Sequence, residues 1–162
     1  MELMTQIAKH FRDVHFGGNW TSSNLKDNLE GMTWQQATTQ VHSLNTIATL
    51  VFHINYYISA VLKVLEGQPL EASDKFSFEC PPIRSYEDWE KLKTKALSEA
   101  EQFVILLEKL PEQILGEHFK DLKYGNYYRN INGIIEHTHY HLGQIAVIKK
   151  IVSEADDNDD TL

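Results

Sequence analysis

Cysteine is nearly absent from this 162-residue sequence, which contains only Cys80. A single cysteine excludes an internal disulfide framework and fits a reducing cytosol. We also find no apolar run that approaches the length of a membrane-spanning helix, and the first residues lack the pattern of a signal peptide. We therefore expect a cytoplasmic protein that does not insert into a membrane.

Basic charge is scarce as well. The 23 acidic residues outnumber the 15 Lys and Arg residues, which gives a formal net charge of −8. Five acidic residues lie in the last ten positions, so the remainder carries −3. Neither part offers the basic surface that phosphate contacts require, which argues against nucleic-acid binding. We expect one domain over residues 1–153 and a solvated acidic tail over 154–162.

Strand signals are missing, whereas helical periodicity is strong. Apolar residues recur every three or four positions in four segments, at about 2–16, 43–66, 86–109 and 130–153. The second segment is rich in β-branched residues, but about two dozen residues without a turn signal exceed a usual strand. The longest irregular stretch, 67–84, contains Pro81 and Pro82, which exclude a helix there. The sequence therefore predicts an all-α fold, a four-helix bundle.

Shorter signals mark the helix boundaries. Thr33 with Gln36, and Ser85 with Asp88, have the spacing of a capping box. Between residues 22 and 37 the pattern suggests one or two short helical turns.

Three of the eight histidines lie within "IEHTHYHLGQI" at 135–145. On a strand all three would share one face, but on a helix only His137 and His141 do. The surrounding apolar period favours a helix, so we expect His139 at the surface. A histidine pair one turn apart can bind a divalent metal, although such pairs also arise by chance.

A third metal ligand has to come from another helix. His53 is the best candidate because it lies in the middle of the apolar segment 43–66. The alternative is a core histidine bonded to a backbone or hydroxyl group. Near His53, Asn55, Tyr56 and Tyr57 either line a pocket or belong to the core. We expect solvated rings for four other histidines, which lie near element ends or in connections: His10, His15, His42 and His118.

Several enzyme motifs are absent. Thr138 stands where an HExxH zinc protease would have its glutamate, and we expect Glu136 at the surface. No glycine-rich phosphate loop is present. We interpret Cys80, which precedes two prolines, as a loop thiol without a catalytic role.

The segments "LVFHINYYISAVLKVLEG" (50–67) and "GIIEHTHYHLGQIAVIKK" (133–150) resemble the DinB-like superfamily of bacterial four-helix metal proteins. The resemblance covers the chain except its acidic tail. It implies an up-down-down-up bundle with a long crossover, commonly a homodimer. It also implies that His53, His137 and His141 bind nickel, zinc or a similar divalent ion, with water completing the shell. Gly143 would allow close helix approach, and Gln144 would orient a neighbouring side chain.

Relatives in that superfamily include transferases and isomerases that use low-molecular-weight thiols such as bacillithiol or mycothiol. A metal would lower the pKa of a thiol or of water, which predicts thiol transfer to a small electrophile or hydrolysis of a small-molecule substrate. Thiol transfer is favoured on the resemblance alone. Two other hypotheses are a non-catalytic, metal-stabilised dimer and a partner-binding bundle whose histidines have no role.

Overall fold

The computed structural model describes residues 2–159, and it describes side chains for residues 2–155. Within this range the chain forms six α-helices and three short 3-10 helices, and its one β-type contact is an isolated bridge between His118 and Asn126. The predicted all-α class is confirmed. The α-helices are α1 (Leu3–Phe16), α2 (Leu25–Leu29), α3 (Trp34–Thr38), α4 (Ile47–Leu65), α5 (Tyr86–Leu107) and α6 (Tyr127–Asp159).

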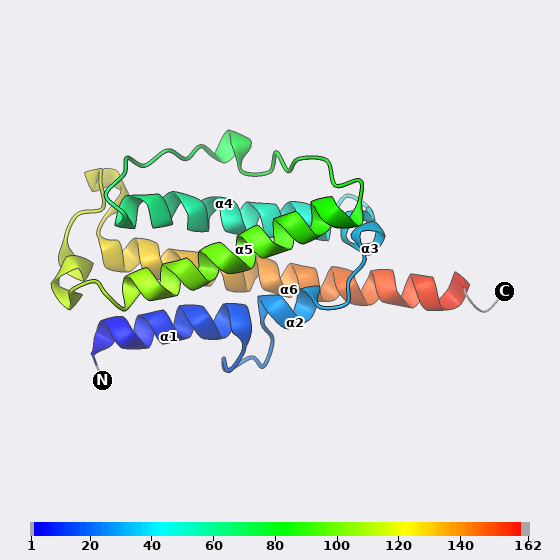
Figure 1. Ribbon diagram of the computed structural model, residues 1–162, viewed down its shortest axis with the longest axis horizontal. Coiled ribbons are helices and arrows are strands. Elements are labelled where there is room, and N and C mark those ends of the chain that lie inside the picture. The colour runs from blue at the N-terminus through cyan, green and yellow to red at the C-terminus, as the bar shows by residue number, and fades with distance from the viewer. Residues whose placement is uncertain (1, 160–162) are drawn as a thin grey trace.

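The four long helices, α1, α4, α5 and α6, pack side by side (Figure 1). Helix α4 contacts α5 and α6, and α1 contacts the same two helices. Helices α4 and α5 run in one direction, and α1 and α6 run in the other (Figure 1). Because α4 and α5 are parallel, the connection between them has to return along the length of α4. This connection, residues 66–85, includes the 3-10 helix Asp74–Phe76.

Side-chain caps fix the starts of several helices. The capping box at Thr33 and Gln36 is complete, as predicted. Ser85 accepts a hydrogen bond from the backbone N–H of Asp88, but the Asp88 carboxylate accepts from Arg84 N–H and not from Ser85. The predicted box there is therefore only half formed. Thr46 caps α4 by accepting from Thr49 N–H, so the helix begins later than the apolar pattern at 43 suggested.

The ends of α6 also differ from the sequence prediction. The helix begins at Tyr127 rather than near Asn130, and it continues past Ser153 to Asp159. No glycine or proline follows Ser153 to stop it. The first part of the predicted acidic tail, 154–159, is therefore helical, and residues 160–162 lie outside the described range.

Helix α4 contradicts one expectation. By length and composition alone, Ile47–Leu65 is apolar enough to cross a membrane, although we expected no such run. In the fold, 67% of its most apolar window is buried, and core helices of soluble proteins pass the same test. The helix is apolar on several sides because α5, α6 and the short helix α3 all pack on it.

Candidate metal centre

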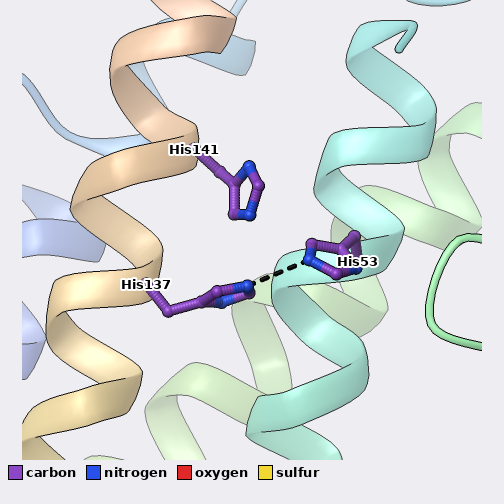
Figure 2. A group of neighbouring side chains, drawn as sticks. All are labelled: His53, His137 and His141. Atoms are coloured by element: carbon purple, nitrogen blue, oxygen red, sulfur yellow. Dashed lines mark hydrogen bonds between the residues drawn. The ribbon is translucent and has the colours of Figure 1, made fainter. Parts of the chain in front are cut away.

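Three histidines meet where α4 packs on α6. His137 and His141 project from one face of α6 toward His53 on α4 (Figure 2). The Nε2 atoms of His53 and His137 are 3.0 Å apart. One ring nitrogen from each of the three residues lies within 4.8 Å of the other two. The structure therefore brings together the three residues selected from the sequence, and their role as ligands remains a prediction.

Hydrogen bonds orient two of the three rings. Nδ1–H of His53 donates to the backbone carbonyl of Ser77 at 3.1 Å, and Nδ1–H of His141 donates to the Gln144 side-chain carbonyl at 2.7 Å. Both partners are carbonyl oxygens that only accept, so the proton has to be on Nδ1 in each ring. The Nε2 atoms of His53 and His141 then carry no proton. Gln144 thus has the orienting role that the resemblance implied.

The third ring, His137, lacks such a partner. Its Nδ1 is buried and has no hydrogen bond within the described residues. Its Nε2 faces His53 Nε2, which carries no proton, so His137 Nε2–H donates in this contact. One proton therefore lies between the Nε2 atoms of His137 and His53, and both atoms face the centre of the cluster.

Burial disfavours the charged form of His137 and His53. It lowers the pKa of His137 to about 4, and the neighbouring His141 and His53 contribute to the shift. Burial also lowers the pKa of His53. A neutral imidazole is the form that binds a metal ion.

The donor set fits a divalent transition metal. Zinc binds imidazole nitrogens at about 2.0–2.1 Å, and imidazole also suits nickel, copper and iron. A tetrahedral shell with those bond lengths would place ligand nitrogens about 3.4 Å apart, between the shortest and longest spacings of the cluster. Within residues 2–155 the cluster contains no fourth side chain of a ligand type. To bind through Nε2, His137 would have to carry its proton on Nδ1 instead. Three imidazole nitrogens without a fourth protein ligand are typical of a site that leaves a position open.

Aromatic side chains surround the imidazoles. Phe78 stacks on His53 with ring centroids 3.7 Å apart and an interplanar angle of 11°. Tyr57 packs edge-on against His53 and His137, and Tyr140 packs against His141. The Tyr57 hydroxyl donates to Asp74 Oδ1 at 2.6 Å. These contacts hold the rings in a partly apolar environment.

A cavity of about 460 Å³ begins at the histidines and runs between α4 and α6. His53, His137 and Tyr57 line it at this end, which confirms that Tyr57 lines a pocket. Tyr56 instead bonds to the backbone of Ser73, and Asn55 is buried against Glu99 of α5, so neither lines the cavity. Its remaining walls are mainly apolar, formed by Ala60, Val61, Leu70, Ala72, Phe119, Gly133 and Ile134.

The sequence did not indicate that the connection between α4 and α5 contributes residues to the site. Ser77, Phe78 and Asp74 reach the site from an irregular segment without a motif. These residues reach His53 because the connection between α4 and α5 runs back along α4 (Figure 1). No local signal in the sequence could have assigned these residues to the site.

Two expectations at other positions are wrong. His15 is fully buried, donates from Nδ1 to the Phe11 carbonyl at 2.8 Å and stacks on the Phe11 ring. His15 follows the buried residues Met4, Ala8 and Phe11 at a spacing of three or four positions. This periodicity in the sequence could have predicted that His15 is buried. Gly143 does not provide close helix approach, because a Cβ there would meet nothing within 4 Å.

The other candidates lie where they were expected, except that His139 is not at the surface. His139 is half-buried beside His10, with ring centroids 5.9 Å apart, and stands outside the cluster of three. His10, His42, His118 and Glu136 are exposed. Burial raises the pKa of the Cys80 thiol to about 11, so this side chain stays protonated, which supports its interpretation as an unreactive loop thiol.

Comparisons with known proteins identified no relative of this chain. No family model, curated protein or solved structure matches the chain. The assignment of the site therefore rests on the geometry of His53, His137 and His141.

Proposed function

We propose that the chain binds one divalent transition-metal ion, nickel or zinc, through His53, His137 and His141, and that it transfers a thiol to a small electrophile. The observation that carries this proposal is the convergence of three imidazoles at one end of a cavity of about 460 Å³. A cavity of this size suits a small molecule. When bound, the ion would lower the pKa of a thiol or of water, which supplies a nucleophile near neutral pH.

The protein residues position and shield the reactants. Ser77 and Gln144 hold His53 and His141 through their Nδ1 atoms, which fixes the direction of the Nε2 lone pairs. Phe78 covers one face of His53. The apolar part of the cavity wall, between α4 and α6, would accept the apolar body of a substrate.

In the proposed reaction the thiol sulfur forms a bond to an electrophilic carbon. The bond between that carbon and its leaving group breaks, and the leaving group departs with the electron pair. The thiol proton passes to solvent. No redox partner is needed, because the reaction is a substitution.

The acid–base groups of the site favour thiol transfer over hydrolysis. Water ionises far less readily than a thiol, so metal-assisted hydrolysis is commonly aided by a nearby general base. Among the residues whose side chains are described, Asp74 is the one carboxylate that lines the cavity, and it is engaged by the Tyr57 hydroxyl. Glu136 is exposed on α6. A thiol, with a pKa near 8.5, needs much less assistance.

The arrangement of helices supports a further part of the proposal, the DinB-like bundle type. The order of directions along α1, α4, α5 and α6, with the long connection between α4 and α5, is the one that the resemblance implies. We also propose a homodimer. Exposed apolar side chains follow one face of α6 at Tyr140, Val147 and Ile151, with exposed fractions of 66%, 56% and 42%.

The proposed activity is tested by conjugation. Protein loaded with Ni²⁺, Zn²⁺ or Mn²⁺ is assayed with several low-molecular-weight thiols and a model electrophile, and we expect a rate well above that of the His53→Ala variant. His139→Ala serves as the control, because its ring lies outside the cluster. Equal rates in the wild type and His53→Ala for every thiol would contradict thiol transfer. Release of hydrolysis product in the same assay would instead support the hydrolase alternative.

A non-catalytic metal site is the remaining alternative. The spectrum of a cobalt-substituted sample separates it from the enzyme. We expect the spectrum to change when a thiol or azide is added. A closed tetrahedral spectrum that neither ligand alters would support a structural role.

A further inference from the structure

The cavity continues well beyond the histidines. Arg129 and His137 both line it from α6, eight residues apart, which corresponds to about 12 Å along the helix axis. On the opposite wall, α4 contributes residues from His53 to Val61, and α4 runs antiparallel to α6. The cavity therefore has a histidine end and a far end near the start of α6.

Charge is divided between these two ends. Asp74, an acidic residue in the lining, bonds to Tyr57, which packs on His53 and His137, so it belongs to the histidine end. The two basic residues, Lys123 and Arg129, line the far end. Two cations in one cavity of a chain with a net charge of −8 indicate a preference for a negatively charged ligand.

The two cations are available to a ligand. Within residues 2–155 Arg129 forms no ion pair. Lys123 lies 3.6 Å from Asp121, and both side chains are more than half exposed. Such an exposed pair is weak and easily replaced.

The local backbone holds Arg129 in place. The Asn126 side chain accepts from Arg129 N–H at the start of α6, and Arg129 Nη1 donates to the Tyr124 carbonyl at 3.4 Å. Gly125 has φ +77°, and a Cβ there would lie 3.2 Å from Arg129 Cδ, so the arginine side chain lies across the glycine. A guanidinium group has five N–H donors, and most of them remain for a ligand.

We propose that Lys123 and Arg129 form an anion-binding subsite for a carboxylate or phosphate group. The ligand of the cavity would be an elongated small molecule with this anionic group at one end and its reactive group at the histidines. The assignment of the reactive end rests on the proposed function. The subsite itself rests on the two cations and the cavity between them and the histidines.

The first experiment compares ligands that differ in charge. Zinc-loaded protein is titrated by calorimetry with ω-mercaptocarboxylates, from 3-mercaptopropionate to 8-mercaptooctanoate, and with the matching ω-mercaptoalcohols. At one or more chain lengths we expect the carboxylate to bind about tenfold more tightly, as for one charge-assisted contact. The gain should shrink at high salt. Equal dissociation constants at every length would overturn the proposal.

Variants of Arg129 and Lys123 test whether these residues cause the preference for the carboxylate. R129Q and K123Q remove the charge but keep a polar side chain, and we expect the double variant to lose the preference for the carboxylate. K150Q is the matched control, because Lys150 is exposed on α6 and does not line the cavity. A preference that persists in the double variant would also overturn the subsite.

A second titration separates the subsite from the proposed function. Metal-free protein is titrated with hexanoate, hexyl phosphate and hexanol, and the tighter of the two anions identifies the preferred group. Arg129-dependent binding of an anion, without binding of mercaptoalcohols to zinc-loaded protein, would support the subsite and contradict the proposed function. Binding of mercaptoalcohols without any preference for an anion would overturn the subsite alone.

Discussion

At the residue scale, the chemistry of the site depends on which nitrogen of each imidazole carries the proton. Ser77 and Gln144 accept from Nδ1 of His53 and His141, so both rings present an unprotonated Nε2 toward the third histidine. His137 has no such partner for Nδ1 within the described residues. Two of the three rings are thus oriented through Nδ1, whereas the hydrogen bond of His137 is the one between its Nε2 and His53.

Gln144 gives the sharpest test of this orientation. In Gln144→Ala the ring of His141 loses its acceptor, and we expect the affinity for zinc to fall about 10- to 100-fold. Gln144→Glu keeps an acceptor at the same position and should retain most of the affinity. Competition against a chelating dye measures both. An unchanged affinity in Gln144→Ala would show that the contact does not orient the ligand.

At the element scale, the site is a product of how α4 and α6 pack. Helices α1 and α5 were predictable because their buried positions recur every three or four residues. Helix α4 is apolar nearly all round, and it was predictable because about two dozen residues without a turn signal exceed a usual strand. His53, His137 and His141 could also be selected in advance, because they lie on apolar helices at one-turn spacing or in mid-helix. Ser77, Phe78 and Asp74 could not, since their contacts depend on the path of an irregular connection over twenty residues away from His53.

Helix α1 carries a separate, pH-dependent element of stability. Burial lowers the pKa of His15 to about 4 from its ordinary 6.5, against the opposing effect of its bond to Phe11. Between these two values the unfolded chain binds the extra proton and the folded chain does not. The free energy of unfolding therefore falls as the pH drops from 6.5 to 4, by about 3 kcal/mol from this residue. Above pH 6.5 the contribution is constant.

His15→Leu removes this titration. In metal-free protein we expect the variant to lose less stability than the wild type between pH 7 and pH 4, measured by urea unfolding. Gln6→Leu, which adds a leucine at an exposed position of the same helix without removing a titratable group, should keep the wild-type dependence. Parallel curves for the wild type and His15→Leu would contradict the assigned cause. The comparison uses slopes with pH, so a constant packing effect of the leucine does not affect it.

At the scale of the whole molecule, one cavity and one apolar surface lie on different parts of α6. The cavity runs from His137 toward the start of the helix, whereas the exposed residues Tyr140, Val147 and Ile151 follow its later turns. A dimer formed through these turns would leave the mouth of the cavity near Arg129 uncovered. Association and ligand binding are then compatible in the same molecule.

The proposed dimer is tested at Val147. A glutamate in place of this exposed side chain should leave the fold intact but place a charge in the interface, so Val147→Glu is expected to sediment as a monomer. Ile105→Glu makes the same change at an exposed apolar position on α5 and should leave the dimer unchanged. Identical molecular masses for Val147→Glu and the wild type would exclude this surface as the interface.

Metal analysis of purified protein shows whether His53, His137 and His141 bind a metal ion together. The wild type and His139→Ala should each contain about one divalent ion per chain. The triple variant His53→Ala, His137→Ala, His141→Ala should contain none, with circular dichroism confirming that it remains helical. A wild-type protein without stoichiometric metal, including after incubation with zinc or nickel, or a folded triple variant that binds as much as the wild type, would contradict the account.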